Sequence, residues 1–100
     1  MKRRAVEISD EARADLLALY DWIAEATSPA VAIRYVDRVE AYVLGFDIAS
    51  ERGHLREDIR PGLRIVGFEH RVTIAFMVEE TRVVILRIFY AGRNWFDLIQ

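Results

Sequence analysis

Arginine dominates the basic side chains of this sequence. Thirteen of the fourteen basic residues are arginine, and Lys2 is the only lysine. A guanidinium group presents a planar fork of N–H donors that binds phosphate or carboxylate oxygens in pairs. The pattern therefore favours contact with an acidic group of another molecule. A coding sequence rich in G and C would raise the share of arginine equally well, so both interpretations stay open at this point.

Side chains that could cleave a phosphodiester are also present. Cleavage without a metal needs a base, a cation at the phosphate and an acid for the leaving group. The candidates of these types are Arg64, Arg71, Arg87, Glu57, Asp58, His54, His70 and Tyr90. Each histidine has a simpler interpretation as a solvated surface residue, since His54 lies in a charged segment and His70 in a predicted tight turn. Neither is accompanied by an HxxxH motif or a carboxylate pair, so no metal site is predicted.

Length and composition limit the classes of protein that this chain can belong to. One hundred residues, 53% of them hydrophobic, predict one globular domain over residues 1–100. The net charge of −2 argues against binding nucleic acid by bulk charge. Without cysteine there are no disulfides, thiolate chemistry or cysteine-based zinc sites. The scattered glycines form no phosphate loop or dinucleotide fingerprint, so no cofactor is expected.

The amino-terminal stretch MKRRAVEIS is basic but is not followed by an apolar run, so no signal peptide is predicted. The apolar runs are also too short to cross a bilayer, which takes about 20 residues. We therefore expect a cytoplasmic protein that does not enter the membrane.

The first half of the chain should hold a strand and two helices. Alternation predicts a strand at about residues 4–8, and Ser9 or Asp10 then caps a helix that ends near residues 26–27. Ser28 caps a second helix, with proline at its first position, that runs to about Ser50. Within it, Gly45 would be explained by a close approach of the two helices, and Gly53 is the expected stop signal.

The second half should form a sheet. A charged segment at residues 52–62 reads as a loop, and three β-rich runs follow at residues 63–68, 71–78 and 82–90. Their short connections predict an antiparallel meander. The fold class is therefore α+β, in the order strand, helix, helix, strand, strand, strand. The helical hairpin can cover one face of the sheet, which leaves an apolar face open to a partner.

Arginine in the middle of the last strand needs an explanation of its own. We expect Val84, Leu86 and Ile88 to face the helices, which places Arg87 on the open face, where water keeps its charge. The alternative is a structural arginine that is paired with a nearby carboxylate.

Several short motifs in one order carry a resemblance to a known family. They are Asp15-Leu16, Asp21-Trp22-Ile23, Ser28-Pro29, Arg34-Tyr35, Gly62-Leu63-Arg64, Ile85-Leu86-Arg87-Ile88 and Gly92-Arg93-Asn94. Over about residues 5–96 the chain resembles the RelE/ParE superfamily of bacterial toxins, and most of all its ParE branch. The chain departs from the pattern at three places. Many relatives carry histidine where this chain has Tyr90 and aspartate where it has Asn94, and they often show proline before glycine where this chain has Glu51-Arg52-Gly53.

The resemblance implies a compact toxin that inhibits DNA gyrase by binding. It also implies a ParD-like antitoxin whose carboxyl-terminal segment wraps the toxin in a heterodimer or heterotetramer, with operator DNA bound only through the antitoxin. Members of the RelE branch instead cleave mRNA on the ribosome. Because the chain is slightly acidic and has a single lysine, we favour inhibition by binding over such cleavage. A third possibility is a non-toxic relative that only binds antitoxin.

Three sets of residues follow from these hypotheses. Target binding is assigned to Arg64, Arg87, Arg93, Asn94 and Trp95. Antitoxin binding is assigned to the apolar side chains Leu17, Trp22, Tyr35, Tyr42, Phe76 and Phe89, the first four of which lie off the main helical stripes. A nuclease would use Arg64, Arg87 and Tyr90. Alternatives are core packing for Trp22, and a tail that folds back over the sheet edge for Trp95 and Phe96.

Overall fold

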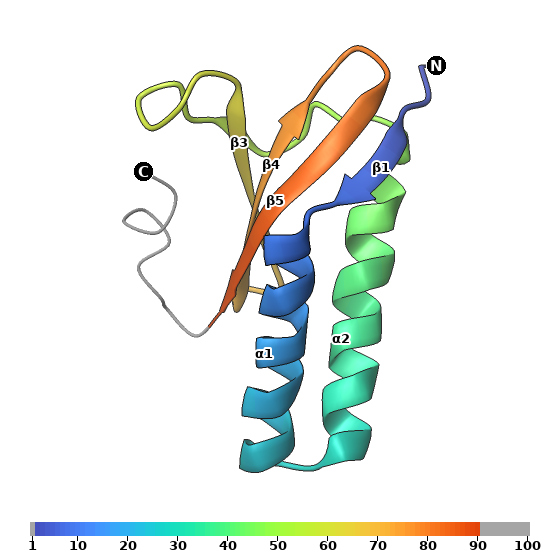
Figure 1. Ribbon diagram of the computed structural model, residues 1–100, viewed down its shortest axis with the longest axis vertical. Helices are drawn as coiled ribbons and strands as arrows, with labels where there is room; N and C mark the ends of the chain where they lie inside the picture. Colours follow the sequence, from blue (N-terminus) through green and yellow to red (C-terminus); the bar gives the residue numbers. More distant parts are fainter. Residues whose placement is uncertain (1, 91–100) are drawn as a thin grey trace.

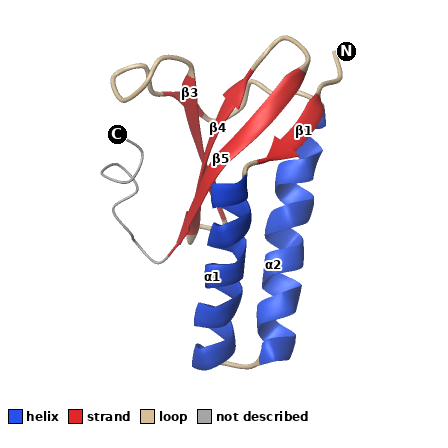
Figure 2. Ribbon diagram, in the orientation of Figure 1, coloured by secondary structure: helices blue, strands red, loops and turns tan. Residues whose placement is uncertain are grey.

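The computed structural model describes residues 2–90 and confirms the predicted order of elements (Figures 1 and 2). The elements are β1 (Ala5–Ile8), α1 (Asp10–Ala26), α2 (Pro29–Leu44), the 3-10 turn η1 (Gly45–Asp47), β2 (His54–Leu55), β3 (Leu63–Phe68), β4 (Val72–Val78) and β5 (Arg82–Tyr90). The short strand β2 is an addition to the prediction. No helix in the described part of the chain is both long and apolar enough to cross a membrane.

Both predicted helix caps are confirmed. The Ser9 hydroxyl accepts a hydrogen bond from the backbone N–H of Ala12 at 3.0 Å, and the Ser28 hydroxyl accepts one from Val31 at 3.2 Å. These bonds satisfy amide donors that the first turn of a helix leaves unpaired. Two residues, Thr27 and Ser28, separate the helices, so α1 and α2 form a tight hairpin.

The roles predicted for two glycines are wrong. Helix α2 ends at Leu44 and not near Ser50, and Gly45 is its C-cap residue. A Cβ atom at Gly45 would have nothing within 4 Å, so no close helix approach requires this glycine. Gly53 has φ of +70°, and a Cβ atom there would lie 2.2 Å from the carbonyl oxygen of Ile65. Its role is to let the loop pass close to β3, and not to end a helix.

The sheet has the strand order β1-β5-β4-β3-β2. Strands β3, β4 and β5 form the predicted antiparallel meander, and β1 pairs in parallel with the first part of β5, from Ala5 opposite Arg82 to Ile8 opposite Ile85. Beyond Ile85 the chain of β1 turns into α1, so the rest of that edge of β5 meets helix α1 (Figure 1).

Both faces of the sheet carry packed apolar side chains. The helices pack on Val72, Ile74 and Phe76 of β4 and on Val83, Ile85 and Ile88 of β5, all of them buried. On the opposite face, Leu63, Ala75 and Phe89 form a second buried cluster, packed by Ile59, Ile65 and Leu86. Ile59 comes from the charged loop before β3. The expectation of a bare apolar face is therefore wrong for this part of the sheet, because the chain partly covers it.

A bulge in β5 explains why the predicted facing is wrong for the first part of that strand but correct for Arg87, Ile88 and Phe89. Arg87 lies opposite Ala75, yet Ile85 lies opposite the next residue, Phe76. The extra residue shifts the alternation of side chains by one position. As a result Ile85 and Ile88 both reach the helices, whereas Leu86 joins the cluster on the other face and Val84 also points away from the helices.

Candidate functional site

The helical hairpin extends beyond the sheet that supports it (Figure 1). A groove lies between the hairpin, the turn between β3 and β4, and the end of β5. Its volume is about 470 Å³, within the range of about 300–1,000 Å³ typical of ligand pockets. We call it the hairpin groove. It is lined by Leu19, Trp22, Ile23, Ala26, Thr27, Val31, Tyr35, Arg38, Glu69, His70, Arg71, Val72 and Tyr90.

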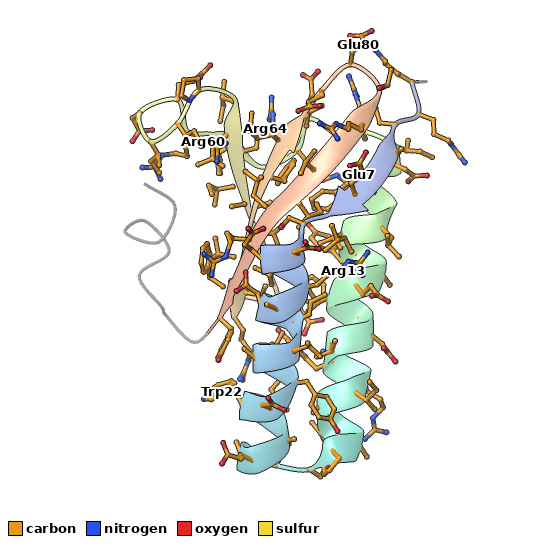
Figure 3. All side chains as sticks on the ribbon, viewed as in Figure 1. Glu7, Arg13, Trp22, Arg60, Arg64 and Glu80 are labelled. Atoms are coloured by element: carbon orange, nitrogen blue, oxygen red, sulfur yellow. The ribbon has the colours of Figure 1, made fainter. Side chains whose placement is uncertain are left out.

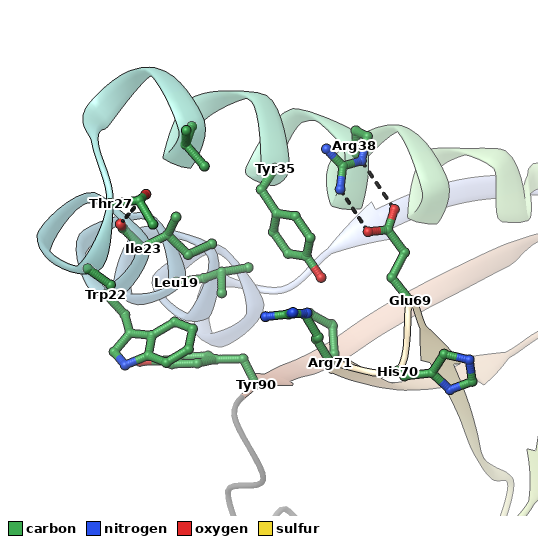
Figure 4. A pocket seen from close by; sticks show the side chains of 13 residues that line it. Leu19, Trp22, Ile23, Thr27, Tyr35, Arg38, Glu69, His70, Arg71 and Tyr90 are labelled. Carbon is green, nitrogen blue, oxygen red and sulfur yellow. Dashed lines mark hydrogen bonds and ion pairs between the residues drawn. The ribbon is translucent and has the colours of Figure 1, made fainter.

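One wall of the hairpin groove is aromatic and aliphatic. Trp22 projects from α1 (Figure 3) and is 44% exposed. Its ring lies 5.1 Å from that of Tyr90, at an angle of 42°. Leu19 and Ile23 continue this wall toward α2 (Figure 4). An exposed indole beside a second ring is a common anchor surface in protein interfaces, since aromatic side chains bury much area at little cost in conformational entropy.

The opposite rim is the turn between β3 and β4, which is tied to α2. The Arg38 guanidinium donates to both carboxylate oxygens of Glu69, at 3.1 and 2.7 Å (Figure 4). These hydrogen bonds lower the pKa of Glu69 below its ordinary range. Glu69 and His70 have φ of +51° and +59°, a left-handed conformation that costs a residue with a Cβ atom about 1–2 kcal/mol. The rim is therefore held in a strained turn whose position the Arg38 pair fixes.

Two polar groups between these walls have no hydrogen-bonding partner within residues 2–90. The Tyr35 hydroxyl is buried and makes no hydrogen bond. Burial raises the pKa of Tyr35, as does Glu69, and the charges of Arg38 and Arg71 oppose the shift. The Arg71 side chain extends beneath the Tyr35 hydroxyl (Figure 4). In the part of the chain that is described, its guanidinium makes no hydrogen bond or ion pair.

Arg87 is held by a buried carboxylate. Its Nε and a terminal nitrogen donate to the two oxygens of Asp15 at 2.8 and 3.0 Å, and the backbone N–H of Ile88 donates to the same carboxylate at 2.8 Å. The hydrogen bond with Asp15 raises the pKa of Arg87. The expectation of a solvated, unpaired Arg87 is wrong. The alternative, a structural arginine paired with a carboxylate, is confirmed.

The three residues assigned to a nuclease do not come together. Arg64 lies opposite Phe76, so its side chain is on the helix-covered face, whereas Arg87 lies opposite Ala75 on the other face. Tyr90 lies opposite Val72, four residues along β4 from Phe76, or about 13 Å away. Arg64 is also engaged, because it donates to the carbonyl oxygen of Arg52 at 3.2 Å and lies 3.7 Å from Glu51.

The carboxylates proposed as acid or base partners are engaged as well. Asp58 accepts two hydrogen bonds from Arg56, at 2.9 and 2.8 Å, and Glu57 accepts one from the backbone of Gly62 at 2.8 Å. Among the described residues, no group of three or more histidine, aspartate or glutamate side chains could hold a metal ion.

The residues assigned to antitoxin binding fall into three groups. Leu17 and Trp22 are exposed, at 69% and 44%. Tyr35 and Tyr42 are half-buried, and the Tyr42 ring packs 4.9 Å from Phe68. Phe76 and Phe89 are buried, so neither is an accessible contact on this chain. Arg93, Asn94, Trp95 and Phe96 lie outside the described residues.

Sequence reasoning missed the way in which the rim of the groove is built. Arg38 and Glu69 are 31 positions apart, and no spacing rule connects a helix to the turn of a distant β-hairpin. Arg71 was considered only as a cation for phosphodiester cleavage. Its place beside Tyr35 depends on how α2 packs over β4. The one available signal was a two-residue turn without glycine, which suggests a conformation imposed by other contacts.

The fold and the groove place this chain among the small α+β domains. An accessible groove of aromatic and arginine side chains is suited to contact with another polypeptide. Residues 6–95 match the family described as the ParE toxin of the type II toxin-antitoxin system parDE. The chain belongs to this ParE toxin family. No curated protein matches it.

The solved structures that are similar to this chain include two toxin–antitoxin systems. One is described as the chromosomal ParDE toxin–antitoxin system from P. aeruginosa, with 25% identity, a TM-score of 0.78, and coverage of 90% of this chain and 98% of that chain. The other is the toxin–antitoxin complex RelBE2 from Mycobacterium tuberculosis, with 22% identity, a TM-score of 0.67, and coverage of 92% and 95%. The second likeness concerns the fold alone.

Proposed function

We propose that this toxin inhibits DNA gyrase by binding it, and that a ParD-like antitoxin neutralises the toxin. The observation that carries the preference for binding over cleavage is the separation of Arg64, Arg87 and Tyr90. Arg64 and Arg87 project from opposite faces of the sheet, and each is already engaged by a carboxylate of this chain. Membership of the ParE family over residues 6–95 supports the choice of gyrase.

The proposal of an antitoxin partner is supported by the exposed apolar side chains of the hairpin. Leu17, Trp22, Val31, Ile33 and Leu44 are all at least 41% exposed. Exposed apolar side chains gathered on one hairpin suit a partner that buries them. The similar structures are described as a ParDE system and a toxin–antitoxin complex, which agrees with this interpretation. The complex would be a heterodimer or heterotetramer, and operator DNA would be bound through the antitoxin.

The test is induction of the chain without its antitoxin, together with assays on purified proteins. We expect filamentation and DNA-damage signalling in cells, and inhibition of gyrase supercoiling by the purified chain. Rapid arrest of translation with cleaved mRNA would instead identify a ribosome-dependent nuclease. Normal growth from a well-folded, expressed chain would identify a non-toxic relative. Either result would overturn the proposal.

Target residues can be tested in the same assay. Arg93, Asn94 and Trp95 stay as predictions for the gyrase contact. Arg93→Ala and Trp95→Ala should weaken gyrase inhibition, and the thermal unfolding temperature of each variant is measured beside it. Arg64→Ala and Arg87→Ala need a stability measurement beside the activity, because both side chains hold the fold together.

A further inference from the structure

The Tyr35 hydroxyl is the least satisfied polar group at the hairpin groove. It is buried and has no hydrogen-bonding partner in the described part of the chain. A buried hydroxyl without a partner is unfavourable, and proteins seldom keep one unless something else completes it. Because the ring lies on the lining of an open groove, the missing partner can come from outside the chain.

Arg71 indicates the chemistry of that missing partner. Its guanidinium extends beneath the Tyr35 hydroxyl (Figure 4), and no ion pair within residues 2–90 holds it. The carboxylate on the rim, Glu69, already accepts hydrogen bonds from two nitrogens of Arg38, one to each oxygen. Both groups line the same groove, and the charge of Arg71 acts on Tyr35. A hydroxyl donor and a guanidinium without an ion pair of its own match one carboxylate, which can accept from both.

The rest of the groove indicates what carries this carboxylate. Trp22 and Tyr90 present their rings about 5.1 Å apart, and Leu19, Ile23 and Val31 add aliphatic surface. A free inorganic anion would leave this wall exposed to water. A peptide segment with an apolar side chain beside an acidic one would cover the wall and reach Arg71 at the same time.

We propose that the hairpin groove binds a segment of a protein partner that carries an apolar side chain and a neighbouring Asp or Glu. The apolar side chain packs against Trp22 and Tyr90, and the carboxylate accepts hydrogen bonds from the Tyr35 hydroxyl and the Arg71 guanidinium. The Arg38–Glu69 pair positions the rim. Taking the antitoxin as this partner rests on the proposed function. The recognition chemistry itself rests on the groove.

The first experiment uses two probes that differ only in charge. 4-Phenylbutyrate has a ring and a carboxylate, and 4-phenylbutyramide has the same ring with a neutral amide. Both are titrated into the full chain while the NMR signals of the Trp22 indole, the Tyr35 ring and the Arg71 side chain are followed. We expect the carboxylate to bind about tenfold more tightly, as for hydrogen bonds to a charged group.

Three variants identify the groups responsible. Tyr35→Phe removes only the hydroxyl, and Arg71→Gln replaces the charged guanidinium by a shorter, neutral amide. Each should weaken phenylbutyrate about tenfold and leave the amide unchanged. Arg13→Gln is the matched control, because Arg13 is an exposed arginine of α1 that does not line the groove. It should leave both affinities as they are.

Four outcomes would overturn the proposal. Equal affinity for the two probes would mean that the groove does not recognise a carboxylate. Equal losses of phenylbutyrate affinity in Arg71→Gln and Arg13→Gln would mean that the net charge of the protein, and not a contact with Arg71, attracts the probe. Asp97 is an acidic residue of this chain outside the described residues. If Asp97→Asn shifted the Tyr35 and Arg71 signals without any probe, the acid would come from this chain. Concentration-dependent dimerisation that quenches probe binding would make a second copy the occupant. Gyrase plays no part in these titrations. A negative result would therefore count against recognition by the groove and leave the proposal that gyrase is the target untouched.

Discussion

The carboxylate of Asp15 holds the guanidinium of Arg87 and the backbone N–H of Ile88 at the same time. Strand β1 pairs with β5 only as far as Ile85, and Ile88 lies just beyond this pairing. A side chain of α1 therefore completes the sheet edge where the neighbouring strand ends. Asp15 is only 6% exposed, so the hydrogen bonds from its two partners replace those that water would otherwise make to the carboxylate.

Removal of this carboxylate should destabilise the protein strongly. We expect Asp15→Ala to lower the free energy of unfolding by about 3 kcal/mol, because it leaves Arg87 unpaired and the Ile88 amide without an acceptor. Chemical denaturation measures the effect. Asp21→Ala, at an exposed position of the same helix, should change stability by less than about 0.5 kcal/mol. Similar losses in both variants would contradict a special role for Asp15.

The two partners should be energetically coupled. In a double-mutant cycle, Asp15→Ala with Arg87→Ala should be less destabilising than the sum of the single variants by about 1–3 kcal/mol. The reason is that neither single deletion leaves its partner satisfied. Additive losses would mean that the pair adds little beyond the separate contacts of each side chain.

Glycine at position 70, in the turn between β3 and β4, should make the protein more stable than the histidine that is there. His70 has φ of +59°, so His70→Gly should raise the free energy of unfolding by up to about 1 kcal/mol by relieving the left-handed strain. Glu69→Gly is the matched comparison, since it relieves a similar strain but removes both hydrogen bonds from Arg38. A gain in Glu69→Gly as large as that in His70→Gly would show that the Arg38 pair does not support the rim.

The Arg38–Glu69 pair predicts a dependence of stability on acid pH. Hydrogen bonding lowers the pKa of Glu69 below its ordinary 4.5. A depressed pKa in the folded state contributes stability that is fully present above pH 4.5 and is lost as the pH falls through the folded-state pKa. We expect Glu69→Gln to flatten the decline of the unfolding temperature below pH 4.5. The pair is exposed to solvent, so the effect should shrink in high salt. Glu25→Gln, on an exposed residue with no ion pair in residues 2–90, should leave the decline unchanged.

Tyr35→Phe should stabilise the isolated chain while it weakens binding. The hydroxyl is buried without a partner, so its removal should raise the free energy of unfolding by about 1 kcal/mol. Denaturation of the free chain measures this gain, and co-purification with the antitoxin measures the loss. A destabilised Tyr35→Phe variant would show that the hydroxyl is already satisfied within the folded chain.

Local sequence rules predicted most of the fold. Ser9, Ser28 and Pro29 marked the helix starts, and the alternation in residues 72–78 correctly separated the two faces of β4. The same alternation failed in β5, because the bulge at residues 86–87 depends on the pairing register with β4. The length of α2 was overestimated because its apolar stripe continues through Phe46, which is buried in η1 and not in the helix.

The site was harder to predict than the fold. Trp22 and Leu17 were found because apolar side chains off the core stripe must face solvent or a partner. The sheet face of Arg87 was predicted correctly, but its pairing was only the alternative, because its carboxylate, on α1, lies 72 positions away in the sequence. Phe76 and Phe89 were expected at an exposed face, but β4 turns Phe76 to the helices and the second cluster buries Phe89.

The parallel pairing of β1 with β5 has a consequence for biosynthesis. Ala5 lies opposite Arg82, so β1 cannot pair until β5 has been translated. Joining such distant segments carries a large loop-closure entropy and raises the contact order, which slows folding. A nascent chain that stops before β5 has neither the β1–β5 pairing nor the arginine that neutralises Asp15. Such an incomplete product should remain unfolded, so folding of this domain would follow the synthesis of β5.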